Sequence, residues 1–208
     1  MALSREEEVQ ILSKVYSLIK AKAFILGIPD QLIGKYYRGA KDVLKRIQRI
    51  DYGRGYVKAV ILSTKASKSA PEHPVVIRDI FSGKPRTVMV GVPIEESYHY
   101  VIVAEHMMKC NCPVALRNAS KADKYLEQFV KRHGLRYSPG DMLFSKHVMC
   151  KHTIAVLAKG IGSGAIPISD TLIENITLSL IGLAVAEGVD NERIRRELLR
   201  ILRKRGRR

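Results

Sequence analysis

The sequence predicts an α+β protein in which helices at both ends of the chain flank a small antiparallel β-sheet. Apolar residues recur at helical spacing near both termini, and residues 55–108 are rich in Val, Ile and Tyr and broken by turn formers. With 208 residues and 46% hydrophobic content, the chain is long enough to bury a core. We expect a helical region over 1–52, a sheet region over 53–162 and a second helical region over 165–208.

The N-terminal region is predicted to form two helices. Ser4 and Glu7 make a capping-box pattern, in which two side chains satisfy backbone amides that a helix start leaves unpaired. Apolar residues follow at helical spacing, and Gly27 before Pro29 predicts the end of the first helix. A second helix is expected over residues 30–50.

The sheet region contains four segments with β-type composition. They read YVKAVILST, HPVVIRDIF, RTVMVGV and YHYVIVAEHMM, and Gly, Pro and Ser separate them. We expect three or four antiparallel strands, of which the last runs straight into Cys110.

The rest of the chain reads as helical. Ser120 to Asp123 resembles a helix start, and Gly134 is a stop signal for that helix. His152 opens a short apolar helix, a strongly apolar helix runs from Thr171 to about Glu187, and a basic helix begins near Glu192.

No segment predicts a membrane or secretory role. The longest apolar run, near residues 176–186, is far shorter than the ~20 residues that a membrane span needs. The first residues, MALSREEEVQ, are acidic and lack the layout of a signal peptide. We therefore expect a cytoplasmic protein without a membrane partner, in which thiols stay reduced.

Charge is the strongest compositional feature. The formal net charge is +16, and residues 193–208 contain nine basic residues and one acidic residue. Such asymmetry is typical of proteins that bind a polyanion, most often a nucleic acid. The alternatives are a basic surface that serves solubility and a frayed basic terminus.

The cysteines fall in two tight pairs. KCNC holds Cys110 and Cys112, and after 37 residues MCKH holds Cys150 and His152; the chain has no other cysteine. Structural zinc sites use four Cys and His ligands in a closed tetrahedral set. The spacing therefore predicts one structural Zn²⁺ ion bound by these four side chains.

Other interpretations of the cysteines stay open. A disulfide between Cys110 and Cys112 would be strained and out of place in a reducing compartment. Free cysteines also pack in cores as small hydrophobic residues. A catalytic thiol would need a base, for which His106 and His147 are the nearby candidates.

The two pairs with their surroundings, KCNCPVA and MCKHTIAVLA, resemble the SWIM zinc-finger family, whose pattern is Cys-x-Cys followed by Cys-x-His. The resemblance covers roughly residues 98–159. It implies that a β-hairpin delivers the first pair and a helix the second, and it implies contacts with nucleic acid or protein but no reaction. The spacer is longer than is usual in the family.

The sequence thus favours a non-enzymatic zinc protein that binds nucleic acid. Aromatic content is 6%, and no base-reading motif stands out, so binding through phosphates is expected. Structured RNA, ribosomal RNA above all, is the favoured partner and DNA the alternative. The residues predicted to contact nucleic acid are Arg117, Lys121, Lys131, Arg132, Arg196, Arg200, Arg203, Lys204, Arg205, Arg207 and Arg208.

Two further functions compete with this prediction. In the first, the chain is a DNA-repair or recombination accessory that contacts proteins through the SWIM-like module or through an apolar face of residues 171–187. In the second, it is an enzyme such as a nuclease. The sequence shows no cluster of carboxylates that would carry such chemistry, so we expect no enzymatic activity.

Overall fold

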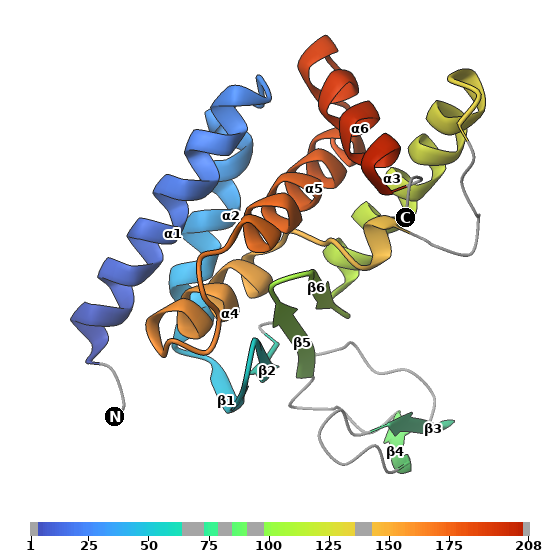
Figure 1. Cartoon of the computed structure of the whole chain (residues 1–208). Coiled ribbons are helices and arrows are strands. Elements are labelled where there is room, and N and C mark those ends of the chain that lie inside the picture. Colours follow the sequence, from blue (N-terminus) through green and yellow to red (C-terminus); the bar gives the residue numbers. More distant parts are fainter. Residues whose placement is uncertain (1–3, 64–72, 79–84, 91–97, 136–142, 206–208) are drawn as a thin grey trace.

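The computed structural model describes residues 4–63, 73–78, 85–90, 98–135 and 143–205 (Figure 1). The α-helices are α1 (Arg5–Ile25), α2 (Asp30–Leu44), α3 (Pro113–Arg132), α4 (Lys151–Gly162), α5 (Asp170–Ala186) and α6 (Glu192–Arg205), and a 3-10 turn, η2, covers Leu143–Ser145. The strands are β1 (Ile47–Gly53), β2 (Tyr56–Leu62), β3 (His73–Arg78), β4 (Pro85–Val90), β5 (Tyr98–Ala104) and β6 (Met107–Cys110).

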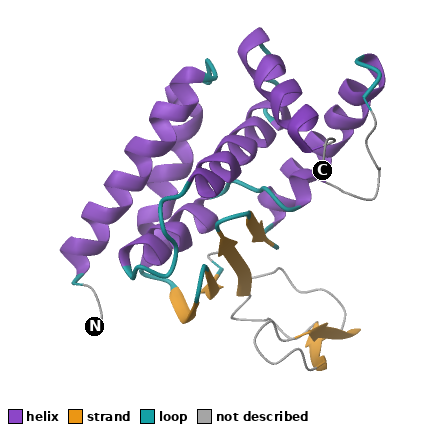
Figure 2. Ribbon diagram, viewed as in Figure 1, coloured by secondary structure: helices purple, strands orange, loops and turns teal. Residues whose placement is uncertain are grey.

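The sheet is small and antiparallel. Four strands follow the order β1-β2-β5-β6, and β3 and β4 form a separate two-stranded pair (Figure 2). Helices precede and follow these strands along the chain. The structure therefore confirms the predicted α+β class.

Helix α4 lies at the centre of the molecule. One side packs against the sheet, where Val57 and Ile61 of β2 and Val101 of β5 are fully buried. Its other side contacts α1 and α2, which lie side by side in Figure 1. Because neighbours surround it, α4 is apolar around almost its whole circumference.

The start of α1 follows the sequence prediction. The Ser4 hydroxyl accepts a hydrogen bond from the Glu7 amide, and the Glu7 carboxylate accepts one from the Ser4 amide. Gly27, with a φ of 67°, follows the end of the helix, as predicted.

The predicted helix over residues 30–50 is wrong in its last third. Helix α2 ends at Leu44, and β1 begins at Ile47 and forms a hairpin with β2. Gly55, with a φ of 79°, allows the tight turn between them. Strand β1 thus lies across the boundary expected between residues 52 and 53.

Two further boundaries differ from the prediction. The last strand does not run straight into Cys110, because a turn at Glu105 and His106 reverses the chain and β6 returns along β5. Helix α3 begins at Pro113, seven residues before the expected start at Ser120, because Cys112 caps it. Both corrections bring the first cysteine pair to a sharp bend between a strand and a helix.

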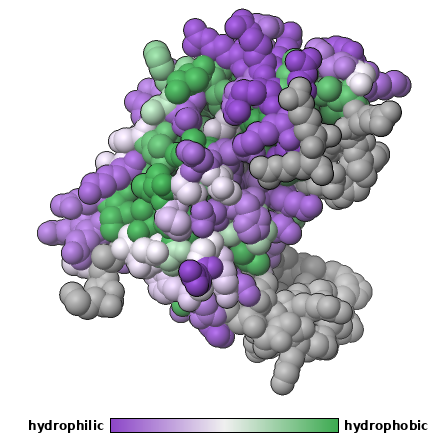
Figure 3. All heavy atoms as spheres, in the orientation of Figure 1, coloured by the Kyte–Doolittle hydropathy of each residue, from purple (hydrophilic) through white to green (hydrophobic). Residues whose placement is uncertain are grey.

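The C-terminal helices form where they were expected. The apolar residues of α5 are buried or half-buried, so the apolar face that the recombination-accessory alternative would use to bind a protein is part of the core. Helix α6 docks through Ile194, Leu198 and Ile201, and its outer surface is largely hydrophilic (Figure 3). Among the described helices, none is both long and apolar enough to cross a membrane.

Candidate metal centre

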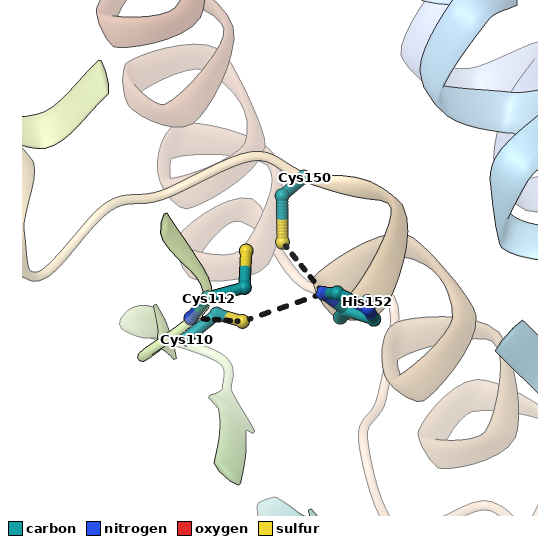
Figure 4. A group of neighbouring side chains, drawn as sticks. All are labelled: Cys110, Cys112, Cys150 and His152. Carbon is teal, nitrogen blue, oxygen red and sulfur yellow. Dashed lines mark hydrogen bonds between the residues drawn. The ribbon is translucent and has the colours of Figure 1, made fainter. Parts of the chain in front are cut away.

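The four side chains predicted as metal ligands meet at one point. The three Sγ atoms and the imidazole nitrogen of Cys110, Cys112, Cys150 and His152 lie within 4.8 Å of one another. Each residue is buried, with at most 6% of its surface exposed. Figure 4 shows the side chains converging from the β6 end and from the start of α4. The group forms a site that can hold one metal ion.

The β5–β6 hairpin positions the first pair. Cys110 is the last residue of β6 and lies opposite Val101 of β5. Asn111 extends the ladder, because its amide donates to the Tyr100 carbonyl (3.2 Å) and its side-chain Oδ1 accepts from the Tyr100 amide (2.8 Å). The residue between the two cysteines thereby fixes the bend that turns both thiols inward.

Cys112 is both a candidate ligand and a helix cap. Its Sγ accepts a hydrogen bond from the Ala115 amide at 3.4 Å, the position that a Ser or Asp oxygen usually takes. Pro113 follows as the first residue of α3, where its missing N–H costs nothing. The amide and the helix dipole both favour a negative charge on this sulfur.

The start of α4 positions the second pair. Cys150 is the N-cap, and its amide donates to the Thr153 hydroxyl at 2.9 Å. That hydroxyl donates in turn to the Cys150 carbonyl at 3.0 Å. His152 is the second residue of the helix, so its ring turns toward the same point as the thiol two residues earlier.

The distances agree with tetrahedral coordination. Nδ1 of His152 lies 3.7 Å from Sγ of Cys110 and 4.0 Å from Sγ of Cys150. In tetrahedral zinc sites, with Zn–S of about 2.3 Å and Zn–N of about 2.0 Å, such atoms lie about 3.6 Å apart. All three cysteines are free thiols. A small contraction of the group would therefore complete a four-ligand site.

The thiols influence each other's protonation. A hydrogen bond to Cys112 raises the pKa of Cys110, and the same bond lowers the pKa of Cys112. Burial raises the pKa of Cys150. The protein alone thus favours a single thiolate, at Cys112. A bound cation would supply the charge that three buried thiolates require.

A second imidazole packs against the ring of His152. Nε2 of His152 is buried and has no hydrogen-bond partner among the described residues. The ring of His99 on β5 lies against it, with centroids 4.6 Å apart. Burial, and then the neighbouring His152, lowers the pKa of His99. His99 therefore favours the neutral form, which suits a position beside a cation.

The predicted nucleic-acid contacts lie in separate places. Lys121 donates to the Ala186 carbonyl at 3.5 Å and so caps α5, while Lys131 and Arg132 are exposed at the end of α3. Arg207 and Arg208 lie outside the described residues. On α6, most of the predicted contacts form ion pairs: Arg196 with Glu192, Arg200 with Glu197, and Lys204 and Arg205 with Glu174.

Of the predicted contacts that the structure describes, only Arg117 lies beside the metal centre. It borders a cleft of about 760 Å³ that Cys112, Cys150 and His152 also line. Lys35 of α2 and Lys151 of α4 line the same cleft and were not predicted. Lys151 lies between Cys150 and His152 in the sequence, so its place beside the metal centre could have been predicted from the ligand pattern. Lys35 offers no such signal, because only the packing of α2 on α4 brings it to the cleft.

Comparisons with protein-family models, with curated proteins and with solved structures find no match to this chain. The resemblance to the SWIM family therefore depends on the ligand spacing and on the delivery of the two pairs by a hairpin and a helix start.

Proposed function

We propose that this chain is a non-enzymatic, zinc-binding protein that binds structured RNA, with ribosomal RNA as the first class of partner to test. The buried group of three thiols and one imidazole carries the proposal. The net charge of +16 supports the nucleic-acid part.

Zinc suits this donor set better than other common ions. Thiolate and imidazole are soft or borderline ligands, which Mg²⁺ and Ca²⁺ avoid. Four protein ligands complete a tetrahedron and leave no position for water or substrate, as in structural zinc sites. The ion would hold the β5–β6 hairpin against the start of α4 and would do no chemistry itself.

The distribution of charge supports a phosphate-rich partner. The exposed basic residues at the end of α3, along α6 and beside the metal centre come from distant parts of the sequence. Contacts at several separate points favour a folded RNA, which offers phosphates over a broad surface. Because these contacts are electrostatic, we expect binding to weaken steeply with salt.

The metal part is tested by elemental analysis of untagged protein. We expect one zinc ion per chain in the wild type and none after Cys110 and Cys150 are both replaced by Ser. Protein purified without chelator that contains no stoichiometric metal, and takes up none when zinc is added, would disprove this part.

The RNA part is tested by ultraviolet cross-linking in cells, followed by sequencing of the attached nucleic acid. We expect enrichment of structured RNA, and co-sedimentation with ribosomal subunits at low salt that is lost at high salt. Recovery of DNA alone would favour the DNA alternative, and recovery of no nucleic acid would disprove this part of the proposal.

A further inference from the structure

The cleft beside the metal centre has the size and position of a binding site. Its volume of about 760 Å³ falls within the range of about 300–1,000 Å³ that ligand pockets occupy. It lies where the start of α3, the start of α4 and one side of α2 meet the end of the sheet. The ligand residues Cys112, Cys150 and His152 form part of its wall.

Three cations from three helices line this cleft. They are Lys35 of α2, Arg117 of α3 and Lys151 of α4, and the described lining residues include no carboxylate. None of the three forms an ion pair with another described residue. Among the described residues, the cleft therefore gathers three cations and no carboxylate, which favours an anionic ligand.

The basic face of α6 differs in this respect. Its groove of about 460 Å³ is also lined by cations, but Arg196, Arg200 and Lys204 each form an ion pair with a glutamate. A phosphate bound there would compete with those carboxylates. The cleft cations have no such competition among the described residues, so the cleft is the stronger phosphate site of the two.

An aromatic ring adds a second kind of contact. Tyr98, the first residue of β5, lines the cleft and is 39% exposed. Val114, 38% exposed, adds apolar surface to the wall. Exposed rings next to cations are how proteins bind single strands, because bases stack on the ring while phosphates meet the cations. An acidic peptide would use the cations but would gain little from the ring.

We propose that this cleft binds a single-stranded segment of nucleic acid, with its phosphates on Lys35, Arg117 and Lys151 and a base stacked on Tyr98. The inference rests on the proposed function, the binding of structured RNA. It narrows that function to one binding site and to one kind of RNA segment, an unpaired strand such as a loop or an end of a folded RNA. Base stacking on a side chain requires such an unpaired base.

The metal ion would organise this site. Helix α3 starts directly after Cys112 and α4 directly after Cys150, so coordination fixes the two helix starts that carry Arg117 and Lys151. Both helix N-termini also add partial positive charge at the cleft. We therefore expect chelation of zinc to weaken strand binding even where the chain stays folded.

The first experiment compares two triple variants of the zinc-loaded full chain, matched in charge. One carries Lys35→Gln, Arg117→Gln and Lys151→Gln, and the control carries Arg196→Gln, Arg200→Gln and Arg203→Gln on α6. Binding to a fluorescent single-stranded RNA decamer is followed by anisotropy over a range of salt. Loss of three phosphate contacts predicts about a 100-fold weaker affinity at ~0.1 M salt and a salt slope lower by about 2.

The second experiment tests stacking. Tyr98→Leu should weaken binding by about 5-fold or more, and Tyr98→Phe should bind within about twofold of the wild type, because it keeps the ring. Zinc content and circular dichroism verify folding of every variant.

A third experiment locates the bound strand without any variant. A 4-thiouridine oligonucleotide is cross-linked to the wild type and the labelled peptides are mapped; they should contain Tyr98, Arg117 or Lys151.

The outcomes separate the inference from the proposed function. If the wild type binds RNA but the cleft variant loses no more affinity than the α6 control, or if cross-links map to α6 alone, the cleft inference fails and the proposed function survives. If poly-glutamate displaces the oligonucleotide at equal concentration and Tyr98→Leu changes nothing, the site is one for acidic peptides and the inference fails. If the wild type binds no RNA, both fail.

Discussion

The backbones of Met108 and His147 form an isolated parallel β-bridge. The Met108 amide donates to the Lys146 carbonyl at 2.9 Å, and the Val148 amide donates to the Met108 carbonyl at 3.0 Å. Met108 lies two residues before Cys110, and His147 lies three residues before Cys150. This short pairing brings the two ligand pairs together. The spacer of 37 residues between Cys112 and Cys150 therefore lengthens the connection and leaves the geometry of the site unchanged.

We expect removal of one ligand to destabilise the protein strongly. Cys112→Ser should abolish stoichiometric zinc but keep the cap of α3, because a Ser oxygen is a preferred N-cap acceptor, so the loss reports on the metal. Apparent zinc-binding free energies of about 10–16 kcal/mol in small peptides exceed what a typical domain gains from folding. We therefore expect the free energy of unfolding to fall by at least about 3 kcal/mol, which lowers the Tm by roughly 6–12 °C in thermal unfolding.

A strong chelator provides the control for this variant. It should lower the Tm of the wild type and leave the Tm of Cys112→Ser unchanged, because the variant has no ion to lose. Equal Tm values for the wild type with and without chelator would contradict a structural role for the metal.

Asn111 should set how tightly the metal is held. Asn111→Ala removes the acceptor of the Tyr100 amide and frees the bend between the two cysteines. Substitutions of residues that orient metal ligands typically cost 10–100-fold in metal affinity, so we expect about that loss in a competition with a chromophoric chelator. An affinity equal to that of the wild type would show that the hairpin holds both thiols without this side chain.

His147 should make folding stability depend on pH. It is buried, its Nδ1 lies 2.7 Å from Oδ1 of Asn175, and burial lowers the pKa of His147 to about 4. In the unfolded chain His147 binds a proton near pH 6.5, whereas in the folded chain it stays neutral down to about pH 4. The contribution of neutral, buried His147 to folding stability is therefore complete above pH 6.5 and falls as the pH drops toward 4. From about pH 7.5 to about pH 5.5 the expected loss is about 1.4 kcal/mol in the free energy of unfolding.

The matched variant for this prediction is His147→Asn, which keeps a neutral donor toward Asn175. Acid also protonates the proposed metal ligands, and that effect is common to both proteins. We therefore expect denaturant midpoints of the wild type to fall more than those of His147→Asn over this range. Parallel pH profiles would show that His147 does not contribute.

The metal ligands could be predicted from the sequence because their residue types and spacing are a local pattern. The spacing of Cys110, Cys112, Cys150 and His152 requires no knowledge of the fold. The capping box at Ser4 is equally local. In contrast, residues 47–53 repeat apolar residues at a spacing that also fits a helix, and only pairing with β2 makes them a strand.

The cleft could not be predicted because its parts meet through tertiary packing. Lys35 and Lys151 are 116 residues apart and approach because α2 packs on α4. Gly39 makes this approach close, since a Cβ there would lie 2.9 Å from Cδ of Lys151. The basic tail was easy to see in the sequence, and its ion pairs with Glu192 and Glu197 are local to α6, but the pair of Lys204 with Glu174 depends on the packing of α6 on α5.

The packing of α4 on the sheet should be sensitive at Gly160. A Cβ at this position would lie 2.6 Å from Cδ1 of Ile166 and 3.0 Å from Cγ2 of Val57, both buried, so Gly160→Ala must displace core atoms. We expect Gly160→Ala to lower the free energy of unfolding, measured with denaturant, by about 1–3 kcal/mol. Gly34→Ala in α2 is the matched control, because a Cβ there meets nothing closer than 3.5 Å. This substitution should stabilise the helix by up to about 1 kcal/mol, since Ala favours the helix over Gly. If Gly160→Ala stabilised the protein as Gly34→Ala does, α4 would not lie against β2 as described.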